Sequence, residues 1–270
     1  MTAHTTPASS AKPVAQPGQT LGTLYLVPAP LDFGCAACPP VTDSVPAATL
    51  QMAARLSCWI CENAKSARAY LKRVAEHYPL VQPLQALHIQ ELPHSAHKHG
   101  DRASPYDARP LLANALTGQD IGLLSEAGLP AVADPGSSVV RAAHELGLAV
   151  VPLAGASSLL LAVAASGLNG QSFAFVGYLP QEANARGERI RQLQTLALRS
   201  GQTQLFIETP YRNLALWAAL LQNLEHNTWL SVASGLTLAS SQCIGRSVKQ
   251  WRQCPCPVDT HTPAVFCLGR

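Results

Sequence analysis

Residues 123–130, which read Leu-Leu-Ser-Glu-Ala-Gly-Leu-Pro, constrain the fold more than any other part of the chain. An apolar strand, expected over residues 121–124, leads there into a loop of small residues that Asp134-Pro135-Gly136 closes. A second apolar strand, expected over residues 149–153, ends in another loop of small residues at 154–158. Loops at the carboxyl ends of neighbouring strands leave backbone N–H groups facing one crevice, which is where open α/β sheets bind ligands. The pattern therefore predicts an α/β fold with a site for a nucleoside-like ligand.

Strand and helix patterns alternate along most of the chain. We expect apolar strands at residues 23–27, 56–61, 121–124, 149–153, 173–178, 204–207, 229–233 and 264–268. Helical patterns occur at residues 46–55, 63–77, 138–146 and 214–224, and Asn63 is expected to cap the second of them. The alternation and the hinge-like Gly170 predict two α/β domains, residues 21–170 and 171–270, that face each other across a cleft.

The composition limits the surroundings and the partners. Residues 1–20 consist mostly of Thr, Ala, Ser, Pro and Gln, which predicts a disordered tail without the apolar segment of a secretory signal peptide. Only 13% of the residues are charged, about half the usual share, which favours surface buried in an oligomer. The net charge of +3 permits a nucleic-acid partner without requiring one. The uncharged residues 146–168 are broken by Pro152 and Gly155, so we expect strand, loop and helix there and no membrane span.

The cysteines raise the question of a zinc site. Cys35-x-x-Cys38 and Cys58-x-x-Cys61 have the spacing of the two halves of a four-cysteine site. Cys58 and Cys61, however, fall in an expected buried strand, where residues three apart point to opposite faces of the sheet. The sequence therefore predicts free thiols in a reducing cytoplasm and no metal.

The glycine patterns restrict the choice of cofactor. The chain lacks G-x-G-x-x-G after a strand and lacks G-x-x-x-x-G-K-[ST], the usual signals for dinucleotides and triphosphates. The loops are neutral or acidic, with Glu126 and Asp134, which is unfavourable for a pyrophosphate. A phosphate-free cofactor with a sulfonium charge, S-adenosylmethionine, fits these loops better.

Several motifs in the same order resemble the tetrapyrrole methylase superfamily, and within it the branch of the small-subunit rRNA ribose 2′-O-methyltransferases. The segments that carry the resemblance are 24–30, 124–130, 134–136, 151–155, 165–168, 173–180 and 208–212. The resemblance implies two α/β domains of the tetrapyrrole methylase type, S-adenosylmethionine in the cleft between them, and a homodimer.

The resemblance also implies which residues bind the cofactor. Pro30 is expected to close on it from the first loop, and the backbone of residues 125–127 is expected to meet its methionine part. The full set of positions carried over is Pro30, Ser125, Glu126, Ala127, Val132, Ser157, Ser158, Glu208, Thr209 and Gly235.

The chain departs from this branch where the substrate is concerned. It has Glu62-Asn63-Ala64-Lys65 where the rRNA enzymes have Glu-Asp-Thr-Arg, and residues 233–238 lack their Arg-Glu-Leu-Thr-Lys. The first loop has Leu31-Asp32-Phe33-Gly34 in place of Ile-Gly-Asn-Leu. These differences indicate a divergent sub-branch.

Methyl transfer from a sulfonium is an in-line displacement, and a ribose hydroxyl also needs a proton acceptor. Candidate acceptors are Glu62, Glu208 and a histidine of the loop that holds His94, His97 and His99. Candidate contacts to phosphates or carboxylates are Lys65, Arg68 and Arg212.

Three functions stay open at this stage: methylation of an RNA ribose 2′-hydroxyl, methylation of a tetrapyrrole or another small molecule, and binding of S-adenosylmethionine without catalysis.

Overall fold

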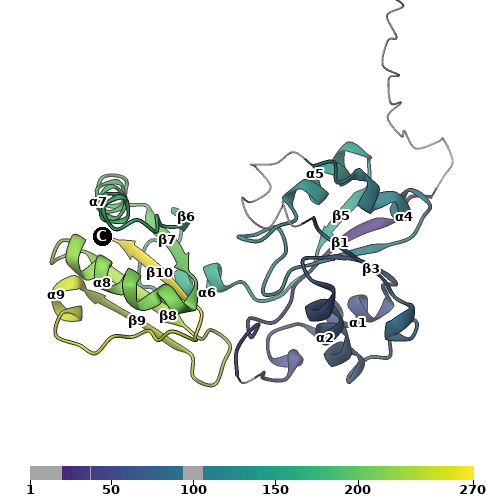
Figure 1. The fold of residues 1–270 in the computed structure, drawn as a ribbon, viewed down its shortest axis with the longest axis horizontal. Helices are drawn as coiled ribbons and strands as arrows, with labels where there is room; N and C mark the ends of the chain where they lie inside the picture. Colours follow the sequence, from purple (N-terminus) through teal and green to yellow (C-terminus); the bar gives the residue numbers. More distant parts are fainter. Residues whose placement is uncertain (1–19, 37, 94–105) are drawn as a thin grey trace, which may run out of the picture.

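The computed structural model describes residues 20–36, 38–93 and 106–270. Within these residues the chain forms two five-stranded sheets, one in each half of the sequence, and the two halves lie side by side (Figure 1). Both are α/β units, as predicted from the alternating patterns. The predicted disordered tail, apart from Thr20, and the loop that holds His94, His97 and His99 lie outside the described residues.

The first sheet is parallel throughout and has the strand order β3-β2-β4-β1-β5. Its strands are β1 (Thr23–Val27), β2 (Cys58–Cys61), β3 (His88–Glu91), β4 (Ile121–Leu124) and β5 (Ala149–Pro152). The helices between them are α1 (Ala47–Arg55), α2 (Ala64–Ala75), α4 (Ala113–Leu116) and α5 (Ser137–Glu145). Since the strands are parallel, the loops that follow β1, β2, β4 and β5 all lie at one edge of the sheet.

Local sequence signals explain where these elements begin. Asn63 caps α2 as predicted, because its side-chain oxygen accepts hydrogen bonds from the backbone N–H groups of Lys65 at 2.8 Å and Ser66 at 3.4 Å. The buried side chains of α2 recur at spacings of three and four: Ala67, Tyr70, Leu71 and Val74. That apolar face packs against the sheet, and the charged side chains are left on the other side.

Strand β2 is buried on both faces, and its two cysteines separate as predicted. Cys58 belongs to the core on one side of the sheet, and its thiol donates to the side-chain oxygen of Gln119. Cys61 belongs to the core on the other side, and burial raises the pKa of its thiol to about 12. The part of the chain that the structure describes contains no cluster of metal-ligating side chains.

The second sheet has the strand order β6-β7-β10-β8-β9. Only the β6–β7 pair is parallel, and the other pairs are antiparallel. The strands are β6 (Phe173–Tyr178), β7 (Thr203–Glu208), β8 (Trp229–Ser234), β9 (Gln242–Ser247) and β10 (Ala264–Gly269). Helices α7 (Ala183–Ser200), α8 (Asn213–Asn223) and α9 (Val248–Trp251) contribute to the core on one face of this sheet.

Helix α6 (Ser158–Ala165) covers the other face of the second sheet, although it precedes the expected domain boundary near residues 169–171. Leu159, Ala162 and Val163 pack there against buried side chains of β7, β8 and β10. Figure 1 shows α6 between the two halves. The division at residue 170 stays a prediction. None of the helices in the described ranges is long and apolar enough to cross a membrane.

Candidate functional site

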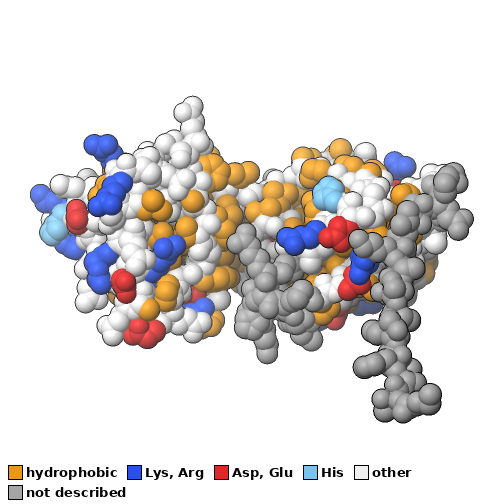
Figure 2. Space-filling model, turned by 90° about the horizontal axis from the view of Figure 1, so that it is seen from above, with side chains coloured by type: hydrophobic (Ala, Val, Ile, Leu, Met, Phe, Trp, Pro, Cys, Tyr) orange, Lys and Arg blue, Asp and Glu red, His pale blue; other side chains and the backbone are white. Residues whose placement is uncertain are grey.

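A cavity of about 570 Å³ lies where the carboxyl edge of the first sheet faces the second sheet. Its volume falls in the range of small-molecule and cofactor sites. The first half contributes the loops after β1, β4 and β5, and the second half contributes the ends of β6, β7 and β8 and the segment before β10. Hydrophobic side chains gather on the facing sides of the two halves (Figure 2).

Most residues that the resemblance assigns to the cofactor line this cavity: Glu126, Ala127, Val132, Ser157, Ser158, Glu208, Thr209 and Gly235. Pro30 and Ser125 are buried and do not line it. The Ser125 hydroxyl lies within hydrogen-bond distance of the carbonyls of Ala127 and Gly128, at 3.2 and 3.4 Å, so it shapes the loop from behind. The structure therefore brings these positions together, while their contact with a cofactor stays a prediction.

The loop after β4 has an unusual backbone. Ala131 and Ala133 adopt positive φ angles of 64° and 66°, which cost an L-residue with a side chain about 1–2 kcal/mol each. They flank Val132, which lines the cavity with 45% of its surface exposed. Such strain persists where the surrounding structure enforces it, and it is typical of binding loops.

Three carboxylates meet beside this loop. The backbone N–H of Glu126 donates to the Glu62 side chain at 3.2 Å, and the Ser66 hydroxyl donates to Glu126 Oε1 at 3.2 Å. Asp134 lines the cavity close to both. Burial, and then the charge of Glu62, raises the pKa of Asp134 to about 7, and a hydrogen bond from Ser125 opposes the shift. The sequence analysis treated Asp134 only as an acidic loop residue, because its neighbourhood is not visible in the sequence.

Glu208 closes its own turn at the end of β7. Its carboxylate accepts from the Thr209 backbone N–H at 2.7 Å and from Arg212 Nε at 2.9 Å. Arg212 Nη2 completes the ion pair at 2.8 Å, and its guanidinium lies over the Tyr211 ring. Since Arg212 is paired with Glu208, both predicted side chains hold the turn that presents Thr209 to the cavity.

Lys65 and Arg68 lie outside the cavity on the first turns of α2, where both are exposed. Arg68 donates to the backbone carbonyl of Ala64 within the same helix. Ser66, between them, contacts Glu126 of the cavity wall. The two cations are therefore placed near the acidic corner and directed to solvent.

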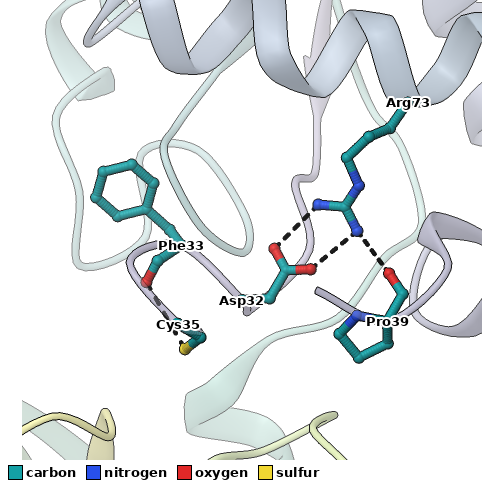
Figure 3. Close-up of polar contacts among 5 residues, drawn as sticks. All are labelled: Asp32, Phe33, Cys35, Pro39 and Arg73. Carbon is teal, nitrogen blue, oxygen red and sulfur yellow. Dashed lines mark hydrogen bonds and ion pairs between the residues drawn. The ribbon is translucent and has the colours of Figure 1, made fainter. Parts of the chain in front are cut away.

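The loop after β1 is fixed by an ion pair that the sequence analysis did not predict (Figure 3). Arg73 of α2 donates to Asp32 at 3.1 and 2.9 Å and to the carbonyl of Pro39 at 2.7 Å. Asp32 is nearly buried, whereas the next residue, Phe33, lines the cavity with 48% of its surface exposed. The helical position of Arg73 showed its charge, and only the fold showed its partner.

The second half adds two side chains that were also missed. Tyr178, at the end of β6, lines the cavity, and partial burial followed by the charge of Asp134 raises the pKa of its hydroxyl. His261 lines the cavity from the segment before β10, and its backbone N–H donates to Asp259 at 2.7 Å.

The lining tests which cofactor the cavity suits. Among the described residues that line it there is no Lys or Arg, and three carboxylates are present, Glu126, Asp134 and Glu208. A pyrophosphate would meet repulsion there, whereas a cation without phosphate groups would be stabilised. The cavity therefore fits S-adenosylmethionine, which is the methyl donor predicted from the sequence.

Comparison with known proteins identifies the relatives of the chain. The sequence model of the family of tetrapyrrole (corrin/porphyrin) methylases matches residues 47–248. A ribosomal RNA small subunit methyltransferase I from Pseudomonas aeruginosa is 34% identical over 142 residues, 53% of this chain and 45% of the relative. The protein of the same name from Pasteurella multocida is 32% identical over 177 residues, 66% of this chain and 57% of the relative. This chain thus spans about half the length of the curated relatives it matches.

Solved structures agree on the fold. The methyltransferase CobJ matches with a TM-score of 0.55 at 17% identity, over 93% of this chain and 95% of that one. A conserved hypothetical protein from Aeropyrum pernix K1 matches with a TM-score of 0.58 at 17% identity, over 93% and 85%. These findings confirm the predicted superfamily, its α/β fold and S-adenosylmethionine as the methyl donor of the family.

Proposed function

This chain belongs to the tetrapyrrole methylase family, and on that premise we propose that it is an S-adenosylmethionine-dependent methyltransferase acting on a ribose 2′-hydroxyl of RNA. The observation that carries the proposal is the cavity between the halves, because its carboxylate-rich lining suits a sulfonium cofactor and a neutral hydroxyl. The curated relatives named ribosomal RNA small subunit methyltransferase I supply the choice of RNA.

The residues divide the work between the halves. We assign the loops at Ala127 and at Ser157–Ser158 to the methionine side, and Thr209 and Gly235 to the adenosine side. When bound, S-adenosylmethionine supplies an electrophilic methyl group. The chain itself holds the acceptor oxygen in line with that methyl group and excludes water, which accounts for much of the rate enhancement in such displacements. Glu62 stays a candidate proton acceptor, and Glu208 is better assigned to positioning Thr209.

The charge distribution favours RNA over a tetrapyrrole. An acceptor rich in carboxylates would be repelled by the carboxylates of the cavity. RNA can present one neutral hydroxyl to the cavity while its phosphates stay outside. Residues 171–270 contain nine Lys and Arg against five Asp and Glu, and basic side chains are spread over this half (Figure 2). Phosphates can bind there, and Lys65 and Arg68 offer further contacts on the first half.

A homodimer in the cytoplasm is part of the proposal. Leu160 and Leu161 of α6 are 52% and 40% exposed, although this helix is apolar on nearly all sides. Exposed leucines on such a helix indicate a surface that a second copy covers. The cysteines are free thiols, which suits a reducing compartment.

A transfer assay tests the function. The protein is incubated with tritiated S-adenosylmethionine and either bacterial small ribosomal subunits, their isolated rRNA or a small-molecule extract. We expect label in the rRNA, in a nucleoside that mass spectrometry identifies as 2′-O-methylated. Label only in the small-molecule fraction would replace RNA with a small acceptor. Calorimetric binding of S-adenosylmethionine without any transfer would leave a binding protein that has lost its chemistry.

RNA contact is tested by salt. RNA binding should weaken steeply as the salt concentration rises, and Lys65→Gln with Arg68→Gln should reduce both affinity and the salt slope by about one to two phosphate contacts. Arg55→Gln, a single-charge control at the end of α1 with no assigned role, should change neither beyond the experimental error. Binding that is insensitive to salt would contradict an RNA substrate.

A further inference from the structure

The proposed reaction needs a group that takes the hydroxyl proton, and most carboxylates at the cavity are already engaged. Glu208 accepts hydrogen bonds from Thr209 and forms an ion pair with Arg212. Glu62 accepts the N–H of Glu126 and does not line the cavity. Glu126 lines the cavity but accepts from the Ser66 hydroxyl. These contacts stabilise the charged forms and tie the side chains to the loops that they support.

Asp134 differs from these carboxylates in its position. It lines the cavity directly, and within the described ranges no Lys or Arg forms an ion pair with it. Its backbone position is fixed, because Ala133 before it and Gly136 after it adopt positive φ angles of 66° and 134°. Tyr178 of the second half lines the same cavity close to Asp134, so the carboxyl faces the gap between the halves.

From this geometry we propose that Asp134 accepts the proton that the acceptor hydroxyl loses during methyl transfer. The inference rests on the proposed function, and it goes beyond the residues that the resemblance assigns.

The step balances in atoms and charge. A lone pair of the acceptor oxygen forms the new O–C bond, and the C–S bond breaks with its electron pair moving to sulfur. The hydroxyl proton passes to the carboxylate of Asp134. The products are a methyl ether, a neutral thioether and a protonated Asp134, which then loses its proton to solvent.

The electrostatic surroundings suit this role. The groups that face Asp134 are Glu62 after β2, Glu126 and Ser125 after β4, and Tyr178 of β6. Burial, followed by the two carboxylates, holds the pKa of Asp134 at about 7, against 3.8 for an ordinary aspartate. A general base is most efficient when its pKa lies near the working pH, because it is then both deprotonated and basic enough.

The test compares kinetics with direct titration. Asp134→Asn keeps the shape of the side chain and removes the base, and Asp134→Glu restores a carboxyl. Asp107→Asn is the matched control, since Asp107 is exposed and pairs only with Arg109. Single-turnover transfer is measured from pH 5 to 9, S-adenosylmethionine binding by calorimetry, and the carboxyl titrations by ¹³C NMR of the free protein.

We expect Asp134→Asn to lower kcat about 100-fold or more with little change in KM for RNA, and to remove the rise in rate near pH 7. Asp134→Glu should recover part of kcat, and the carboxyl resonance that titrates near pH 7 should be missing in Asp134→Asn. The Asp107→Asn variant should match the wild type.

Other outcomes overturn the inference. If Asp134→Asn keeps both kcat and the pH profile, or if Glu62→Gln or His261→Gln removes the pH dependence instead, Asp134 is not the acceptor. A wild-type protein that transfers no methyl group to RNA contradicts the proposed function, and the NMR titration still decides whether Asp134 titrates near neutrality.

Discussion

Ala29 and Gly128 exchange two backbone hydrogen bonds, at 2.9 and 3.0 Å, and so join the loop after β1 to the loop after β4. This short antiparallel bridge lies beyond the ends of two parallel strands that are neighbours in the sheet. Both loops line the cavity, so the bridge fixes the distance between two of its walls. The site thus depends on backbone contacts as well as on side chains.

Gly128→Ala should weaken the site more than its effect on stability alone explains. Gly128 has a φ of 73°, and a Cβ there would lie 3.2 Å from the side chain of Leu31, a residue of the cavity wall. The left-handed backbone costs alanine about 1–2 kcal/mol, and the contact with Leu31 adds to it. Urea unfolding should show this loss, and calorimetry should show S-adenosylmethionine affinity reduced about tenfold.

Gly147→Ala is the control for Gly128. Its φ is 72°, almost the same, but a Cβ there would meet no atom within 4 Å. It should lose about the same stability from the backbone and keep full affinity. Equal affinities in the two variants would show that the Gly128 loop does not contact the cofactor.

Breaking the ion pair between Arg73 and Asp32 should loosen the loop that carries Phe33. Arg73→Ala leaves the nearly buried Asp32 carboxylate without its two hydrogen bonds, which we expect to cost about 1–3 kcal/mol. Affinity for S-adenosylmethionine should fall, because Phe33 lines the cavity. Arg109→Ala, which breaks the exposed pair with Asp107, should cost less than about 1 kcal/mol and leave binding unchanged. A similar loss of stability in both variants would contradict the structural role of Arg73.

The pKa of Asp134 also predicts how stability depends on pH. Because the folded-state pKa is raised to about 7, the folded state binds a proton that the unfolded state has lost between pH 4 and 7. This contribution is fully present below about pH 4 and is lost as the pH rises through 7. Full shielding would give about 4 kcal/mol, and solvent screening at this partly exposed carboxyl reduces that to about 1–3 kcal/mol.

Asp134→Asn cannot titrate, so it should lack this decline. The free energy of unfolding of the variant, minus that of the wild type, should increase from pH 5 to 8 in urea titrations. All other groups titrate in both proteins and cancel in the difference. A difference that stays constant over this range would mean that the Asp134 pKa is not raised.

The elements that the sequence predicted correctly are those whose signals are local. Strands β1 and β4 read as apolar runs, and Asn63 has the residue type and position of a helix cap. Strands β3 and β9 were missed because both lie at sheet edges and are half exposed, with residues such as Gln90 and Arg246. Their extended form depends on pairing with β2 and β8, which no local pattern shows.

The candidate site was predictable only in part, for the same reason. The order of the motifs placed Glu126, Ser157 and Thr209 near one another, since loops at strand ends share an edge. The sequence gives no sign that Asp134 would lie close to Glu62, because that proximity arises from the packing of β2 beside β4. Helix α6 was assigned to the first half because an all-round apolar helix has no periodic face to show what it covers.

The exposed leucines of α6 give the last prediction. If a second copy covers them, Leu160→Glu with Leu161→Glu should convert a dimer into a monomer in light-scattering chromatography, because two charges would be buried without partners. The fold should persist, since the buried face of α6 is formed by other residues, Leu159, Ala162 and Val163. Leu196→Glu on α7, 46% exposed and distant in sequence, serves as the control and should leave the dimer intact. A wild-type protein that is monomeric at micromolar concentration, or a double variant that stays dimeric, would contradict an interface at α6.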